Sequence, residues 1–194
     1  MKKSLLVLMA AAFSLGAVYT GSANAFSLGN GTRTLGTSPA LKKERALRMT
    51  HAPFGYQVFC LKNMRECRSS GASKVAYSNN LMTKLAKVNT RVNRSIRWTR
   101  DKRDEWNLAS NRGDCEDFAL TKRSQLIRMG VPAAALRMAL VKTRKGEAHA
   151  VLVVKTNRGD LVLDNKTGQI RPRSSTGYRW VAMASRNPYR WQYL

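Results

Sequence analysis

The stretch Asn111-Arg-Gly-Asp-Cys-Glu-Asp-Phe-Ala-Leu-Thr-Lys122 predicts a helix with a cysteine in its first turn. Gly113 favours a turn, and Asp114 is a residue type that caps helix N-termini. Apolar residues then recur at helical spacing until Gly130-Val-Pro132 ends the pattern. The first turn of a helix carries unpaired N–H groups and the positive end of the helix dipole. This position therefore favours a thiolate at Cys115.

A histidine and an aspartate later in the chain are candidates for catalytic partners of Cys115. His149 lies in the strand-like run 148–154, and Asp164 closes the run 161–164. A thiol at a helix start, then a His, then a carboxylate is the chain order of papain-like and transglutaminase-like enzymes. In that arrangement Cys115 attacks, His149 acts as general base and then acid, and Asp164 orients the imidazole. The alternatives are a core histidine at 149 and an ordinary Asx turn at 164.

The distance between His149 and Asp164 depends on the hairpin that joins their strands. They face each other directly only if the turn is centred on Thr156-Asn157. A turn centred on Arg158-Gly159 pairs His149 with Gly168 and leaves Asp164 ~13 Å away along the strand. A bulge near Gly159 or unequal strand lengths would reconcile that second turn with a His–Asp pair, and the sequence leaves the alternatives open.

The first 25 residues have the pattern of a secretory signal peptide. Lys2 and Lys3 form a basic start, 5–18 an apolar centre, and Ala23-Asn-Ala25 a small-residue cleavage motif. The apolar run is short for a membrane anchor, and no later stretch predicts a transmembrane segment. We therefore expect an exported protein with a flexible lead-in over 26–50 and one domain over 51–194.

Export would place the three cysteines in an oxidising compartment, where disulfides form. Cys60 and Cys67 lie seven positions apart, a loop that a disulfide can close, which leaves Cys115 unpaired. The alternatives are pairing of Cys115 with an upstream cysteine, or a buried structural thiol. Charged neighbours on both sides of Cys115 argue against simple burial.

Charge is the other strong feature of the sequence. Thirty-five Lys and Arg against eleven Asp and Glu give a net charge of +24. In a cytoplasmic protein this balance would indicate nucleic-acid binding, but in an exported one we expect no nucleic-acid partner. Anionic envelope surfaces or an acidic protein substrate fit better.

The acidic residues gather around the cysteine: six of the eleven lie between positions 101 and 117. Such an island flanking Cys115 is where a hard cation such as calcium could bind. The alternative is that these residues are helix-start carboxylates and salt-bridge partners, and this is the interpretation we favour for Asp117.

The order of predicted elements indicates an α+β protein. The segment 51–60 is predicted as a loop followed by a short strand, with His51 structural or on the surface. Residues 78–98 are predicted to form an amphipathic helix, and the nucleophile helix is expected after a polar loop. The strand-like runs 136–141, 148–154, 161–164 and 178–183 come after it. Helices packed on an antiparallel sheet would place the site at their junction.

An oxyanion hole would use the backbone N–H of Cys115 and one further donor. Trp106 and Gln57 are the side chains that we name as candidates for this second donor or for substrate contact. Trp106 is also of a type that commonly packs in cores.

These motifs resemble those of the bacterial transglutaminase-like cysteine proteinases. The resemblance rests on Gly113–Lys122, on His149-Ala-Val-Leu-Val153 and on Arg158–Asn165, with upstream support from Phe59-Cys60, Cys67, Asp101 and Trp106. It implies a papain-like fold and a triad of Cys115, His149 and Asp164.

The resemblance also implies a setting for the enzyme. Characterised members similar to this chain work in the periplasm and need calcium, which is tied to the acidic residues beside the nucleophile, here Asp114 and Glu116. They cleave a large cell-surface adhesin and so release biofilm, and an inner-membrane receptor for cyclic diguanylate holds them back. The high positive charge and the Cys60/Cys67 pair depart from the best-studied members.

The sequence therefore predicts a cysteine endopeptidase, and two alternative functions stay open. The same triad could transfer the acyl group to an amine, as a transglutaminase or amidase does. A module that binds anionic envelope polymers through its basic surface, with Cys115 inert, is the non-enzymatic alternative.

Overall fold

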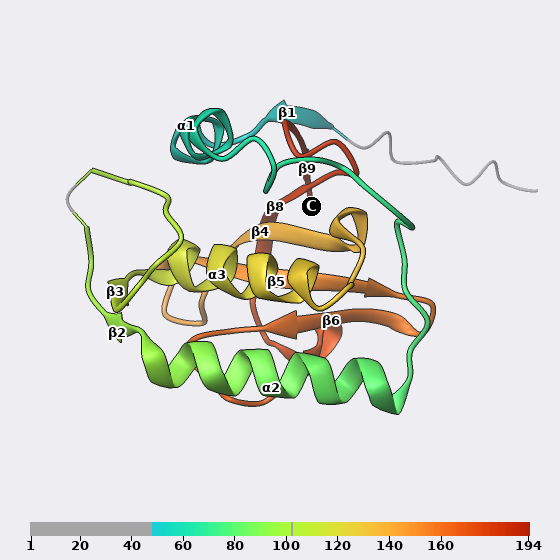
Figure 1. The fold of residues 1–194 in the computed structure, drawn as a ribbon. Helices are drawn as coiled ribbons and strands as arrows, with labels where there is room; N and C mark the ends of the chain where they lie inside the picture. Colours follow the sequence, from blue (N-terminus) through green and yellow to red (C-terminus); the bar gives the residue numbers. More distant parts are fainter. Residues whose placement is uncertain (1–47, 102) are drawn as a thin grey trace, which may run out of the picture. The chain divides into compact units, whose positions relative to one another are not determined.

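The structure, a computed structural model, describes residues 48–101 and 103–194 (Figure 1). The predicted signal peptide and positions 26–47 of the predicted lead-in lie outside the described residues. The last positions of that lead-in are in fact part of the fold. Strand β1 (Met49–His51) pairs antiparallel with β9 (Arg190–Tyr193), so ordered structure begins before the predicted boundary at residue 51.

Three helices precede or face the main sheet. They are α1 (Phe54–Lys62), α2 (Asn79–Ser95) and α3 (Cys115–Arg128). Ser78 caps α2 by accepting from the Leu81 N–H, and Asp114 is the N-cap residue of α3. Gly130, with φ of 82°, terminates α3 where the sequence predicted. Within the described residues, no helix combines the length and the apolar composition needed to cross a membrane.

The main sheet has seven strands, all paired antiparallel, in the order β1-β9-β8-β4-β5-β6-β7. Its remaining strands are β4 (Leu136–Lys142), β5 (Ala148–Thr156), β6 (Gly159–Leu163), β7 (Arg171–Pro172) and β8 (Arg179–Ala184). Two short 3-10 helices complete the order of elements: Ala133–Ala135 lies between α3 and β4, and Arg173–Ser175 lies between β7 and β8. The predicted α+β class, with helices on an antiparallel sheet, is confirmed.

A separate two-stranded parallel ladder lies near the start of α3. It pairs β2 (Arg97–Trp98), which follows α2, with β3 (Arg112–Gly113), which precedes α3. Figure 1 shows this ladder at the end of α2 and beside the first turn of α3. It therefore fixes the entry of the chain into the cysteine helix.

The core lies mainly between the helices and one face of the sheet. The amphipathic pattern of α2 is confirmed, because Leu81, Leu85, Val88, Val92 and Ile96 are all buried. They pack with the inward face of α3 and with alternate residues of β4, β5 and β6. The opposite face carries a smaller apolar cluster that includes Val141, Val151 and Val162. Burial on both faces explains why β5 reads as a continuous apolar run.

The predicted loop and short strand over 51–60 is wrong, since this segment contains helix α1. Pro53, with its restricted φ, stands at the N-cap position. Tyr56, Phe59 and Cys60 are buried at i, i+3 and i+4 spacing, which is a helical pattern. Trp106 packs against α1 at Gly55, where a Cβ would lie 2.4 Å from the indole ring. Aromatic contacts with the rest of the core thus stabilise a helix of weak intrinsic signal.

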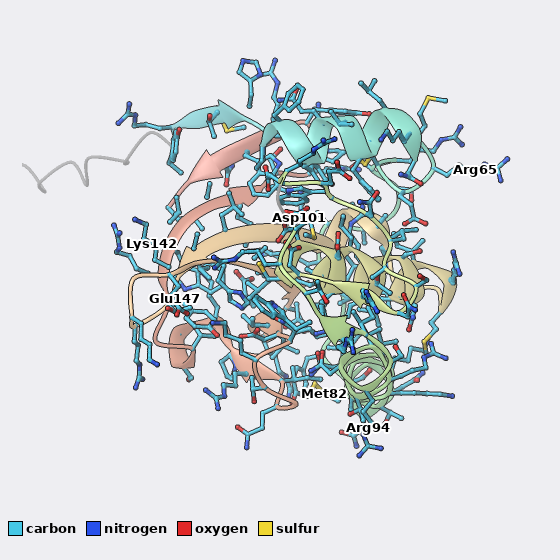
Figure 2. The ribbon with its side chains drawn as sticks, turned by 90° about the vertical axis from the view of Figure 1, so that its left-hand side faces the viewer. Arg65, Met82, Arg94, Asp101, Lys142 and Glu147 are labelled. Carbon is cyan, nitrogen blue, oxygen red and sulfur yellow. A yellow bond between two sulfur atoms is a disulfide. The ribbon has the colours of Figure 1, made fainter. Side chains whose placement is uncertain are left out.

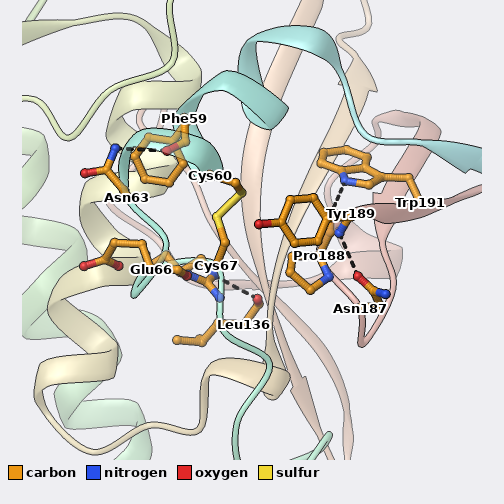
Figure 3. Close-up of a disulfide and its surroundings, with 11 residues drawn as sticks. Phe59, Cys60, Asn63, Glu66, Cys67, Leu136, Asn187, Pro188, Tyr189 and Trp191 are labelled. Carbon is orange, nitrogen blue, oxygen red and sulfur yellow. Dashed lines mark hydrogen bonds between the residues drawn. A yellow bond between two sulfur atoms is a disulfide. The ribbon is translucent and has the colours of Figure 1, made fainter.

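Cys60 and Cys67 form a disulfide, with a Cα–Cα distance of 5.5 Å (Figure 3). The loop that it closes packs on α3 through Glu66. The Glu66 side chain accepts from Ser124 Oγ at 2.8 Å, and its backbone carbonyl accepts from Arg123 Nη1. Arg123 Nε also donates to the Leu136 carbonyl at 3.3 Å. The disulfide loop therefore supports the back of the helix that carries Cys115.

Candidate active site

A cleft of about 950 Å³ opens at the start of α3. Both Cys115 and His149 line it, together with Asp101, Asp114 and Glu116. β5 extends four residues, 148–151, beyond its last pair with β6, which is Leu152↔Leu163. The early end of β6 leaves this part of β5 open toward the cysteine helix.

His149 and Asp164 are in direct contact and buried. His149 Nε2 lies 2.8 Å from Asp164 Oδ1, and the two residues are 3% and 4% exposed. Asp164 Oδ1 also accepts from the backbone N–H of Lys166 at 3.0 Å. Because Nε2 is occupied by the carboxylate, Nδ1 is the ring nitrogen left for a reacting group in the cleft.

The hairpin register lies between the two alternatives left open by the sequence. Thr156 pairs with Gly159, so the turn is Asn157-Arg158. Continuing the register by one pair past Leu163 places Asp164 opposite Val151, two positions from His149 on the same face of β5. Diagonal neighbours of this kind are about 7–8 Å apart at Cα, a distance that an imidazole and a carboxylate can bridge together. No bulge near Gly159 is needed.

Tyr178 is a member of this group that sequence reasoning missed. Its hydroxyl donates to Asp164 Oδ2, and its ring packs edge-on against His149 with centroids 5.7 Å apart. Burial alone would raise the pKa of Asp164, but the bond and charge of His149, with the Tyr178 bond, outweigh it and leave that pKa lowered. Tyr178 stands just before β8, where no local motif marks it; only the folded sheet brings it to Asp164.

Cys115 is half-buried, and its thiol is directed onto the next residue. Sγ donates to Glu116 Oε2 at 3.0 Å, and among the described residues no hydrogen bond joins it to His149. Burial raises the pKa of the Cys115 thiol, and the Glu116 carboxylate raises it further, while a backbone hydrogen bond from Ala150 opposes the rise. The expectation that the helix start alone would favour a thiolate therefore leaves out Glu116.

The acidic residues around the thiol form a compact cluster. One oxygen each from Asp101, Asp114 and Glu116 lie within 4.8 Å of one another. Burial raises the pKa of Asp114, where a hydrogen bond with Glu116 opposes the rise and the Asp101 charge adds to it. Burial and the neighbouring Asp114 raise the pKa of Glu116 to about 8, against the hydrogen bond from Cys115. Asp114 Oδ1 is buried and has no hydrogen-bond partner among the described residues. Three carboxylates held together at this cost fit a bound cation.

Calcium is the cation that this donor set suits, because it takes hard oxygen ligands in flexible numbers. Asp101 joins the predicted pair of Asp114 and Glu116 through its loop, where its two oxygens accept from the N–H groups of Asp104 and Glu105. Asp117 has the structural role expected for it: its carboxylate accepts from the N–H groups of Asn107 and Asp114.

Of the two side chains predicted as oxyanion or substrate contacts, one lines the cleft and the other does not. Trp106 lines the cleft, but it is 5% exposed, stacks edge-on against Tyr56, and donates its N–H to Asp104 at 3.0 Å. Gln57 lies on α1 and donates to the Ala52 carbonyl at 2.7 Å. It does not line the cleft, because the segment is a helix and not a loop leading to a strand. Its role as an oxyanion or substrate donor stays a prediction.

Lys122, the last residue of the opening motif, is fully buried under the site. Its Nζ lies 5.8 Å from the centre of the Phe118 ring and has no hydrogen-bond partner among the described residues. Burial lowers the pKa of Lys122 to about 7, against the attraction of the Asp164 carboxylate, which acts to raise it. A buried amine thus lies within electrostatic range of the His–Asp pair.

A thiol at a helix start, next to a buried His–Asp pair on an antiparallel sheet, defines the papain-like and transglutaminase-like class of cysteine peptidases. The family model for the bacterial transglutaminase-like cysteine proteinase BTLCP matches residues 46–194. The chain belongs to this family.

Solved structures of one bacterial protein are similar to this chain. Calcium-bound Legionella pneumophila LapG matches at 27% identity and a TM-score of 0.49, over 53% of this chain and 64% of that one. The EGTA-treated form matches at 26% identity and a TM-score of 0.46, over 53% and 62%. The match thus spans less than two thirds of LapG. A comparison with curated proteins found no match.

Proposed function

We propose that this chain is a periplasmic cysteine endopeptidase in which Cys115, His149 and Asp164 are the catalytic triad. The observation that carries the proposal is the 2.8 Å contact between His149 Nε2 and Asp164 Oδ1 in the same cleft as the Cys115 thiol. Family membership supports the reaction class. The residue roles rest on the geometry and on chemical argument.

The reaction would proceed in two stages. The Cys115 sulfur attacks the carbonyl carbon of a peptide bond while its proton passes to Nδ1 of His149. The imidazolium, stabilised by Asp164, then protonates the leaving amine as the C–N bond breaks, and a thioester remains. Water attacks that thioester with His149 taking its proton, and the proton returns to the sulfur as the acid product leaves.

Charge that develops on the carbonyl oxygen needs donors that are fixed in advance. The backbone N–H of Cys115 belongs to the first turn of α3, where N–H groups lack partners within the helix. The side chains named from the sequence are occupied elsewhere, since Trp106 donates to Asp104 and Gln57 to Ala52. Backbone donors at the α3 start therefore fit this role better.

Calcium dependence belongs to the same proposal. Asp101, Asp114 and Glu116 would hold the ion. When bound, calcium supplies positive charge that neutralises these carboxylates and reduces the pull of Glu116 on the thiol proton. The chain's own contribution is the geometry: the capped start of α3 sets Asp114 and Glu116 on either side of the nucleophile.

The family resemblance implies the finer parts of the setting. These are export through the signal peptide, a large surface adhesin as substrate, and an inner-membrane cyclic-diguanylate receptor as regulator. Adhesin cleavage would give the enzyme control of biofilm attachment.

Cleavage of a proteome-derived peptide library by the mature chain tests the function. In calcium we expect new peptide termini that Cys115→Ala abolishes and chelation strongly reduces. If Cys115→Ala cut the library as the wild type does, the triad would be wrong. Products joined to an added amine, in place of free acids, would favour the acyl-transferase alternative.

A further inference from the structure

A row of exposed positive charges runs along α2 toward the cleft. We call Lys87, Arg91, Arg94, Arg97, Arg100 and Arg112 the basic stripe; all six are exposed. Lys87, Arg91 and Arg94 recur at steps of four and three residues, which places them on one side of α2, and Arg97 follows in β2. No Asp or Glu occurs between Glu66 and Asp101 in the sequence, so α2 has no acidic residue of its own.

The stripe has no acidic partners among the described residues. The ion pairs there involve His149, Lys155, Lys166 and Arg173, none of which belongs to the stripe. Arg91 bonds only a neutral group, the Gln125 side chain at 2.8 Å. The charges of the stripe are therefore not compensated within the described fold.

The stripe leads directly to the cleft. Arg97 in β2 is the register partner of Arg112 in β3, which brings two guanidinium groups to neighbouring strands. Arg100 follows two residues after β2 and lines the cleft itself. Figure 1 shows α2 ending at this ladder, beside the start of the cysteine helix. A bound chain could thus pass from α2 to the cleft without a break.

Clustering of like charge has a cost. Like charges at i, i+4 on a helix, or opposite each other on paired strands, destabilise the fold. A ligand of opposite charge would offset that repulsion. The cleft carries both signs of charge, since Asp101, Asp104, Asp114, Glu116 and Glu147 line it together with Arg100 and Lys166. Acidic groups of a ligand would therefore favour the stripe, whose side chains are all basic.

We propose that the basic stripe binds an acidic segment of the polypeptide substrate, several residues to one side of the cleaved bond. This inference rests on the proposed peptidase function and specifies its substrate class. Lys87 and Arg94 are about 10 Å apart along the helix axis, a span of about three extended residues. A cluster of two to four Asp or Glu residues matches that length.

A stripe variant, Lys87→Gln/Arg94→Gln/Arg97→Gln, removes three charges and leaves Arg91 with its contact to α3. The matched control is Arg65→Gln/Arg68→Gln/Arg186→Gln, which removes three exposed charges around the disulfide loop. Figure 2 shows Arg65 far from Arg94 and on the α1 side of the domain. Thermal melts of both variants verify that each is folded.

Position-resolved analysis of the cleaved peptide library tests the proposal. Wild-type cuts should be enriched in Asp and Glu at a fixed distance on one side of the bond. The stripe variant should lose that enrichment, and the control should keep it. Wild-type cleavage without acidic enrichment, or enrichment that survives in the stripe variant, would overturn the proposal. A wild type that cuts nothing would instead refute the peptidase function.

A binding measurement tests the basic stripe even if the wild type cuts nothing, because binding needs no catalysis. The Cys115→Ala chain should bind fluorescein-labelled hexaglutamate more tightly than hexaglutamine, and the stripe substitutions should weaken hexaglutamate binding about tenfold. Equal binding by the stripe variant and its control would overturn the proposal. So would a stripe variant that retains hexaglutamate but loses phosphatidylglycerol vesicles, since the surface would then serve a membrane.

Discussion

Tyr178 donates a hydrogen bond to Oδ2 of Asp164, while Oδ1 of the same carboxylate faces His149. The tyrosine ring also packs edge-on against the imidazole. One aromatic residue thus contacts both members of the buried pair. It holds the carboxylate oxygen that does not face His149.

Tyr178→Phe keeps the ring and removes the donor. We expect kcat/KM to fall about tenfold, as for loss of one hydrogen bond to a charged group. Burial raises the pKa of Asp164, whereas His149 and Tyr178 lower it, so the variant should have a higher pKa at Asp164. The acidic limb of the pH profile should therefore move to higher pH. Tyr193→Phe, at an exposed tyrosine, is the control, and an unmoved limb in Tyr178→Phe would contradict this role.

Calcium should stabilise the folded chain. Because the ion binds the native cluster and not the unfolded chain, its addition should raise the Tm and a chelator should reverse the rise. Asp101→Asn and Asp114→Asn should each remove most of this calcium response. Glu105→Gln, an exposed residue of the same loop, should keep it. A Tm that ignores both calcium and chelator would refute the site.

Lys122→Met should alter how stability depends on pH. Burial lowers the pKa of Lys122 to about 7 from 10.5, so between these values the unfolded chain binds more protons than the folded one. Stability from this group therefore rises with pH across that window, by up to about 1.4 kcal/mol per unit. The advantage of Lys122→Met over wild type should be greatest below pH 7 and shrink by pH 9.

Urea titrations at pH 6, 7.5 and 9 measure this difference. Lys62→Met, which removes a charge at an exposed site on α1, is the control for net charge. A stability difference between Lys122→Met and wild type that stays constant over the three pH values would contradict the prediction.

Loss of the disulfide should weaken the support of α3. For a loop of this size, chain-entropy reasoning gives about 2.5 kcal/mol of stabilisation. Cys60→Ala/Cys67→Ala should lower the free energy of unfolding by about that amount. Activity at low temperature should persist, because Glu66 can still reach Ser124. A reductant should have the same effect on the wild type and none on the double variant, and equal stability of the two proteins would contradict the prediction.

The elements with strong local signals were predictable from sequence. The start of α3 at Cys115, its end just before Gly130, and the buried face of α2 follow from caps and periodicity that depend only on neighbouring residues. Helix α1 is not predicted because Pro53 and Gly55 stand at its start, and its buried Tyr56 and Phe59 are of a type that also favours strands. Its stability depends on tertiary contacts with Trp106 and Trp191.

The candidate site also combines features that local sequence predicts with features that depend on tertiary structure. Chain order is enough to nominate Cys115, His149 and Asp164, and spacing is enough to nominate the Cys60–Cys67 bond. Register is not: the Asn157-Arg158 turn, and with it the diagonal contact of His149 and Asp164, depends on how β5 pairs with β6. The contact of Tyr178 with Asp164, and that of Asp101 with Asp114 and Glu116, likewise depend on how distant segments pack in the fold.

Alkylation of Cys115 by iodoacetamide tests the central claim most directly. The rate is followed across pH in calcium by mass spectrometry of the mature wild type, His149→Ala and Asp164→Asn. If Cys115 is a nucleophile served by the His–Asp pair, it alone should react in the wild type. Each substitution should slow the reaction and move its pH dependence toward that of an ordinary thiol. A Cys115 that reacts with the same rate and pH profile in all three proteins would contradict the account.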